Sequence, residues 1–107
     1  MTKRVRSNIA LATILALAGG VSFAQSGGEA TYKAKCASCH GATGMADSGA
    51  GKSLKIKPVN DPDVKAMSEA DMIKVTTDGK GKMPSYKGKL TDDQIKDAVG
   101  FYRSLGK

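Results

Sequence analysis

The chain is short and basic, with 107 residues, 17 Lys and Arg against 10 Asp and Glu, and a formal net charge of +7. Its length leaves room for at most one small domain. Three of the basic residues lie in a predicted leader, and without them 14 basic side chains face 10 acidic ones. A net charge of +4 on an exported chain argues against nucleic acid as a partner.

The N-terminal segment has the three parts of a secretory signal peptide. The basic residues Lys3, Arg4 and Arg6 precede an apolar run over residues 9–21, and small residues follow up to Ala24. An uncleaved membrane anchor is the alternative, but the run is shorter than the about 20 apolar residues that span a bilayer comfortably. We predict a cleaved signal peptide over residues 1–24, a domain over residues 25–107 and a periplasmic location.

The first predicted helix follows the leader and covers residues 27–39. Gly28, Tyr32 and Cys36 fall four residues apart, so they share one face of this helix. The mature chain contains no Trp. A domain this small usually needs a disulfide, a metal or a bound group in addition to side-chain burial.

Two further helices are predicted in the second half of the chain. Residues 68–79 open with Ser68 in a capping position and close at a glycine. Residues 91–106 open with Thr91 and Gln94, which make a full capping box, and then carry an apolar stripe. A shorter turn begins at Asp61, before a proline suited to a first helical position. Since no stretch alternates like a strand, we predict an all-α domain of three or four short helices and long loops.

Both cysteines and the only histidine stand together in Cys36-Ala37-Ser38-Cys39-His40. A disulfide oxidoreductase normally places its cysteine pair after a strand, and none is predicted here. A structural zinc ion needs four ligands, of which this segment supplies three. Cys-x-x-Cys-His is the signature of covalent haem attachment, in which each thiol adds to one vinyl group and the histidine binds the iron. The export signal agrees, because c-type haems are attached outside the cytoplasm.

Met83 is the predicted ligand on the other face of the haem. Met45 lies too close to His40 in sequence to return on the far side. Met67 and Met72 flank or sit on the second predicted helix, where an apolar residue is more often part of the core. Met83 instead lies in a loop, after two glycines that allow close backbone approach and before a proline that stiffens the chain.

With these motifs the chain resembles the class I c-type cytochromes, of the small single-haem bacterial kind, over almost the whole mature length. The resemblance implies the cytochrome c fold, with helices and long loops wrapped around one covalently bound haem c. It also implies a close crossing of the first and last helices, where Gly28 and Tyr32 would meet Phe101. A proline carbonyl orients the proximal histidine in this family, and Pro58 is the candidate for that role.

An iron with His and Met ligands has no open coordination position. The sequence therefore predicts a monomeric electron carrier that shuttles between redox proteins and meets membranes only through partner complexes, rather than an enzyme. A haem-based peroxidase or a gas-binding sensor, with a displaceable Met83, is the alternative. The lysines that bracket Met83 are predicted to steer the protein to acidic patches on its partners, although they could be ordinary solvated side chains. These are Lys80, Lys82, Lys87 and Lys89.

Overall fold

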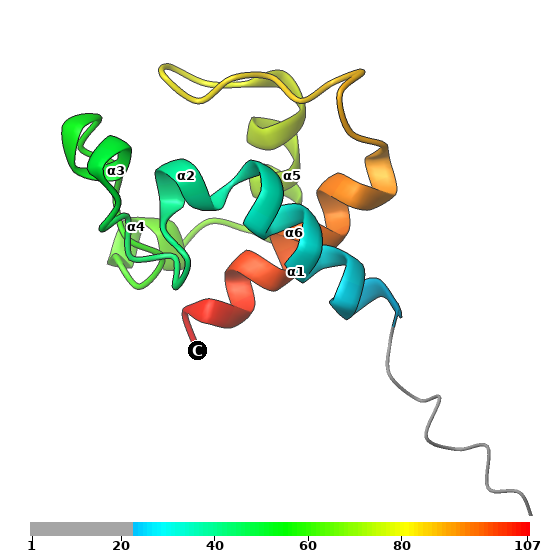
Figure 1. The fold of residues 1–107 in the computed structure, drawn as a ribbon, viewed down its shortest axis with the longest axis horizontal. Coiled ribbons are helices and arrows are strands. Elements are labelled where there is room, and N and C mark those ends of the chain that lie inside the picture. Colours follow the sequence, from blue (N-terminus) through cyan, green and yellow to red (C-terminus); the bar gives the residue numbers. More distant parts are fainter. Residues whose placement is uncertain (1–22) are drawn as a thin grey trace, which may run out of the picture.

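The computed structural model describes residues 23–107, and in these residues the domain is all-α (Figure 1). The helices are α1 (Phe23–Lys35), α2 (Ala37–His40), α3 (Gly49–Ser53), α4 (Pro62–Lys65), α5 (Glu69–Asp78) and α6 (Asp92–Leu105). Within this part of the chain the only β structure is two isolated bridges, Lys80 with Met83 and Lys87 with Leu90. The predicted all-α class is confirmed. The predicted signal peptide lies outside the described residues except for its last two, and no helix in the described range is long and apolar enough to cross a membrane.

The structure divides the helices more finely than the sequence predicts. The first predicted helix is interrupted at Cys36, so that α1 and α2 are separate. A short helix, α3, also forms within the predicted loop after His40. The side chain of Ser48 caps α3 by accepting a hydrogen bond from the Gly51 N–H at 3.0 Å. The count is therefore six among the described residues instead of three or four.

The predicted helix starts are confirmed by their caps. The Ser68 hydroxyl accepts from the Asp71 N–H at 3.1 Å at the start of α5. Thr91 and Gln94 make both bonds of the capping box, at 3.1 and 2.9 Å, at the start of α6. Asp61 caps α4 in the same manner, with a proline as the first helical residue. These helices therefore begin where local hydrogen bonds satisfy their first N–H groups.

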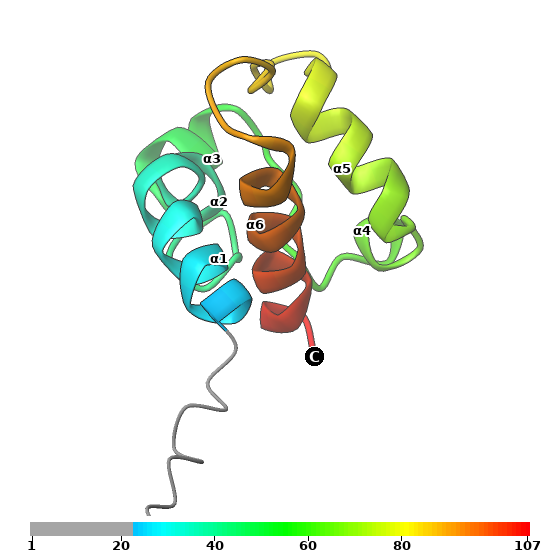
Figure 2. The same cartoon turned by 90° about the vertical axis from the view of Figure 1, so that its right-hand side faces the viewer.

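Helices α1 and α6, from opposite ends of the described chain, cross closely (Figure 2). A Cβ atom built on Gly28 would lie 2.8 Å from the backbone carbon of Asp97 and 3.4 Å from Cβ of Phe101. One turn further along α1, the rings of Tyr32 and Phe101 lie 5.3 Å apart between centroids. The crossing that the family resemblance implies for Gly28, Tyr32 and Phe101 is confirmed.

The apolar core lies where α5 packs against α6. Ile95 and Val99 of α6 and Met72 of α5 are buried together, and Met67 and Tyr102 pack around them. The segment between α5 and α6, which we call the Met loop (residues 79–90), runs over one end of the domain (Figures 1 and 2). Met83 and Tyr86 of this loop line a cavity together with His40 of α2.

Candidate functional site

The cysteine and histidine side chains are held by a short stretch of helical backbone. The Cys36 N–H donates to the Tyr32 carbonyl at 2.8 Å, and the His40 N–H donates to the Cys36 carbonyl at 2.9 Å. Both cysteines are free thiols and half-buried. The motif therefore presents two unpaired thiols and one imidazole from a single turn of chain.

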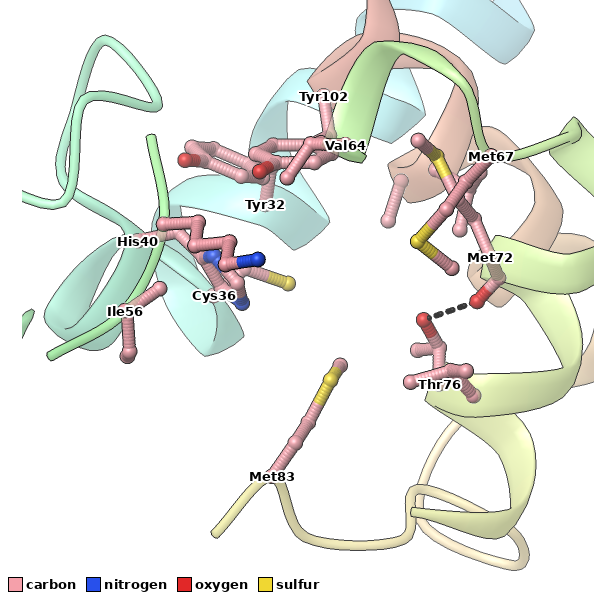
Figure 3. Close-up of a pocket in the computed structure, with 14 residues that line it drawn as sticks. Tyr32, Cys36, His40, Ile56, Val64, Met67, Met72, Thr76, Met83 and Tyr102 are labelled. Carbon is pink, nitrogen blue, oxygen red and sulfur yellow. Dashed lines mark hydrogen bonds between the residues drawn. The ribbon is translucent and has the colours of Figure 1, made fainter. Parts of the chain in front are cut away.

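A largely apolar cavity opens beside His40 and reaches to α5 and α6 (Figure 3). Its volume is about 200 Å³. Val75 of α5 and Ala98 and Val99 of α6 contribute to its wall. An apolar space beside the cysteines and the histidine, in a domain with few large side chains, suits a hydrophobic group.

The structure brings all four predicted site residues to one place. A second cavity, of about 330 Å³, shares part of its lining with the first, and Cys36, Cys39, His40 and Met83 all line it. Cys36, His40 and Met83 also line the first cavity, and the Met83 side chain points into it from the Met loop (Figure 3). The two thiols, the imidazole and a thioether thus border two cavities with shared lining residues, which together we call the crevice.

Three methionines, not one, border the first cavity. Met67 and Met72 line its wall together with Met83 (Figure 3). Met72 is 8% exposed and belongs to the core, as predicted. Met45 is 41% exposed and lines neither of the two cavities. Met83 is itself half-buried and lies in the Met loop, most of whose residues are exposed.

Hydrogen bonds to α1 and α5 hold the Met loop over the site. The Tyr86 hydroxyl donates to the Lys35 carbonyl at 2.9 Å, at the end of α1 next to Cys36. The Ser85 hydroxyl donates to the Thr77 carbonyl of α5 at 2.6 Å. Gly79 turns the chain with φ +81°, and a Cβ there would lie 2.9 Å from the Ser85 nitrogen. Sequence reasoning missed Tyr86, whose only local signal is an aromatic residue shortly after Met83.

Helix α3, which sequence reasoning also missed, packs against the backbone of α2. The Ser48 hydroxyl donates to the Ser38 carbonyl at 2.8 Å. Gly51 packs so closely that a Cβ atom would lie 2.5 Å from the Cys39 carbonyl oxygen. The helix thus fixes the backbone of the motif at its second cysteine.

Burial shifts the pKa values of His40 and Cys36. It lowers the pKa of His40, because an imidazolium is poorly solvated there. Burial, and secondarily the neighbouring Cys39, raises the pKa of the Cys36 thiol to about 11. A neutral imidazole keeps the lone pair that binds a metal.

The His40 ring nitrogen Nδ1 is buried and has no hydrogen-bond partner among the described residues. The Pro58 carbonyl, which the resemblance puts forward as its acceptor, instead accepts from the Asp61 N–H at 2.9 Å. The structure shows no hydrogen bond between His40 and Pro58 among the described residues, so the expected role of Pro58 stays a prediction. Pro58 lies at the start of the turn into α4, and its carbonyl can accept a second hydrogen bond beside that from Asp61.

The predicted docking lysines divide into two pairs. Lys80 and Lys82 line the second cavity, where Lys35 and Lys55 join them. Lys87 and Lys89 do not line it, and the Lys89 ammonium lies 6.0 Å from the centre of the Tyr86 ring. All six lysines are exposed. The mouth of the crevice is thus positively charged on both sides.

This donor set fits a covalently held haem. It supplies two free thiols at the required spacing, an imidazole whose lowered pKa favours the neutral form, and an apolar cavity beside that imidazole. A structural zinc ion fits poorly, since the described residues hold no group of three or more His, Cys, Asp or Glu side chains placed to bind a metal ion.

Comparisons with known proteins point to the same cofactor. A family profile described as "Cytochrome C oxidase, cbb3-type, subunit III" matches residues 24–101. Cytochrome c6 of Leptolyngbya boryana is 44% identical over 76 residues, 71% of this chain and 85% of that protein. Cytochrome c-551 of Halorhodospira halochloris is 36% identical over 69 residues, 64% of this chain and 80% of that protein. The solved structure of the KustC0563 c-type cytochrome superposes with a TM-score of 0.68 at 28% identity, covering 75% of this chain and 98% of that one.

Proposed function

Because this chain belongs to the family of small class I c-type cytochromes, we propose that it is an exported carrier of single electrons, not an enzyme. In this proposal Cys36 and Cys39 attach one haem c, and His40 and Met83 are its axial ligands. The observation that carries the proposal is the crevice lined by these four residues. When bound, the haem supplies an iron that changes by one electron.

The protein's part in this chemistry is to hold the ligands still and keep water out. Thioether bonds to Cys36 and Cys39 would fix the position of His40, since all three lie on one turn. The apolar wall from α5 and α6 excludes water from the ligand side of the cavity. With both axial positions filled from the protein, no coordination site is left for peroxide or a gas, which separates a carrier from a peroxidase or sensor.

Met83 is a better candidate for the axial ligand than Met72 because Met83 lies on a loop and Met72 lies in the core. Met72 is part of the core between α5 and α6, so binding the iron would remove it from its packing partners. Met83 is carried by a loop that is tied to both α1 and α5 and points into the crevice (Figure 3). A loop residue can take up a ligand position without emptying the core.

Replacement of Met83 tests the assignment directly. Met83→Ala should abolish the weak red absorption of the iron(III)–sulfur bond, lower the reduction potential and let the reduced protein bind carbon monoxide rapidly. Met72→Leu is the matched control, because it conserves volume in the core and should leave all three properties near those of the parent. If the red band survives Met83→Ala and is lost in Met72→Leu, the ligand lies on α5. Rapid binding of carbon monoxide by the parent itself would favour the peroxidase or sensor alternative.

The lysines at the mouth of the crevice support a partner with an acidic patch. Four lysines line the second cavity, beside the proposed haem site, where an electron would leave the protein. They are Lys35, Lys55, Lys80 and Lys82. Opposite charge on a redox partner would speed encounter and orient this side of the protein, with a rate that falls as salt rises. The proposed carrier works as a monomer between such partners.

Export completes the proposal. Cleavage after Ala24 would leave residues 25–107 as the mature periplasmic protein. Helix α1 begins at Phe23, so this cleavage removes its first two residues and keeps Gly28 and Tyr32 at the crossing with α6. The mass of the protein recovered from the periplasm tests the cleavage site, since it should correspond to residues 25–107 plus one haem.

A further inference from the structure

Thr76 of α5 is the one buried polar residue in the described part of the chain, with 7% of its surface exposed. It lines the first cavity together with His40 and Met83. Its neighbours on this wall include the apolar residues Val75 and Val99. The proposed axial ligation gives the hydroxyl of Thr76 no part, although valine has the same shape and would make the wall wholly apolar at this point.

The direction of the Thr76 hydroxyl is fixed by a hydrogen bond within α5. The hydroxyl donates to the Met72 carbonyl, with 2.8 Å between the two oxygens. This acceptor lies one turn earlier in the same helix, so the bond is local. In Figure 3 the bond runs from Thr76 towards Met72, away from His40 and Met83. The hydrogen, which is the positive end of the O–H dipole, therefore points away from the two proposed iron ligands, and the oxygen is the nearer end.

The next residue along α5, Thr77, makes the same kinds of bond on a different face. Its hydroxyl donates to the Ile73 carbonyl at 2.8 Å. The carbonyls of Thr76 and Thr77 both accept from the Met loop, from the N–H groups of Tyr86 at 3.0 Å and Lys87 at 3.1 Å. Thr77 lines neither the first nor the second cavity. The two threonines therefore differ in whether the side chain borders the proposed haem site.

We propose that the Thr76 hydroxyl lowers the reduction potential of the bound iron, because the oxygen end of its dipole faces the cavity. The inference rests on the proposed ligation by His40 and Met83, which puts the iron between those two side chains. Loss of an electron adds one positive charge to the iron. A negative dipole end nearby stabilises that charge, and it does so more strongly in apolar surroundings than in water. The oxidised form therefore gains more than the reduced form, and the potential falls.

The reduction potentials of four holoproteins test this, measured by optical titration with redox mediators at one pH and one salt concentration. The first is the parent. Thr76→Val removes the hydroxyl and keeps the shape of the side chain, whereas Thr76→Ser keeps the hydroxyl. Thr77→Val is the matched control, because it makes the same chemical change on the same helix outside both cavities. Thr76→Ala takes the place of Thr76→Val if that variant yields no holoprotein.

Thr76→Val should raise the equilibrium constant for reduction roughly two- to tenfold, and tenfold corresponds to about 59 mV for one electron. Thr76→Ser and Thr77→Val should lie close to the parent. An unchanged potential in Thr76→Val overturns the inference, and so does a rise of the same size in Thr77→Val or Thr76→Ser. A lower potential in Thr76→Val overturns it as well, because the hydroxyl would then donate to the Met83 sulfur and not to Met72.

The weak red absorption of the iron(III)–sulfur bond separates this inference from the proposed function. Its absence from the parent would refute ligation by Met83. Its loss in Thr76→Val alone would overturn the inference, because the hydroxyl would then hold the ligand in place instead of acting through its dipole.

Discussion

The crossing of α1 and α6 predicts opposite effects for the same substitution at two helical glycines. In Gly28→Ala, the added Cβ would lie 2.8 Å from the backbone carbon of Asp97 and closer still to its carbonyl oxygen. This atom belongs to the middle of α6 and cannot rotate away as a side chain could. Gly100, on the same α6, has nothing within 4 Å of the position that a Cβ would take.

The magnitudes follow from two competing terms. Alanine gains roughly 0.5–1 kcal/mol over glycine inside a helix. Overpacking typically costs about 1–3 kcal/mol, and a clash with backbone belongs at the upper end of that range. The net expectation is a loss of about 2 kcal/mol for Gly28→Ala and a gain of about 0.5–1 kcal/mol for Gly100→Ala. For a domain of this size each kcal/mol moves the melting temperature by roughly 4–8 °C.

Thermal unfolding of the two holoproteins, followed by far-ultraviolet circular dichroism, measures both effects. Gly28→Ala should melt roughly 8–16 °C below the parent, and Gly100→Ala should melt a few degrees above it. Covalent attachment keeps the haem on the chain in all samples, so differences report the protein. If Gly28→Ala is as stable as the parent, the close approach at Asp97 does not fix the position of α1, and the account of the crossing is wrong.

Three further predictions concern the loop, the charges and the cofactor. Tyr86→Phe removes the hydrogen bond between the Met loop and α1, which contributes about 0.5–1.5 kcal/mol. The reduced protein should therefore bind carbon monoxide roughly 2- to 10-fold faster. An unchanged rate would show that this hydrogen bond does not restrain Met83. Lys82→Glu should slow oxidation by anionic ferricyanide by up to about fivefold at low salt, and it should speed oxidation by a cationic cobalt phenanthroline complex. The same change at Lys96, which lines neither cavity, should have a smaller effect on both rates. Equal effects at the two positions would mean that the lysines near Met83 are ordinary solvated side chains. Chemically prepared apoprotein should lose most of its helical circular dichroism, because the apolar cavity beside His40 then loses the group that fills it. A cooperative transition near that of the holoprotein would contradict this.

Features that depend on neighbours in sequence were predictable from the sequence. The capping box of Thr91 and Gln94 and the cap of Ser68 bond across three residues, so a short pattern contains both partners. The spacing of Cys36, Cys39 and His40 within one turn is likewise local. Gly28 and Tyr32 recur at helical spacing, and family resemblance supplied Phe101 as their partner.

The contacts that only the tertiary structure decides join residues far apart in the chain. Tyr86 bonds to the carbonyl of Lys35, 51 residues earlier, and no local pattern records such a pair. The same holds for Met67 and Met72, which local periodicity assigns to the core and the folded structure also places on the wall of the cavity.

The environment of His40 shows the division most clearly. Its residue type and its place beside Cys39 predict a role as a metal ligand from sequence alone. Which aromatic residue lies against its ring depends on how α6 crosses α1, because that crossing brings the centre of the Tyr102 ring to 5.2 Å from the centre of the imidazole. The sequence determines which side chains the motif offers, because Cys36, Cys39 and His40 lie within one turn of chain. The packing of distant helices determines which residues surround that motif.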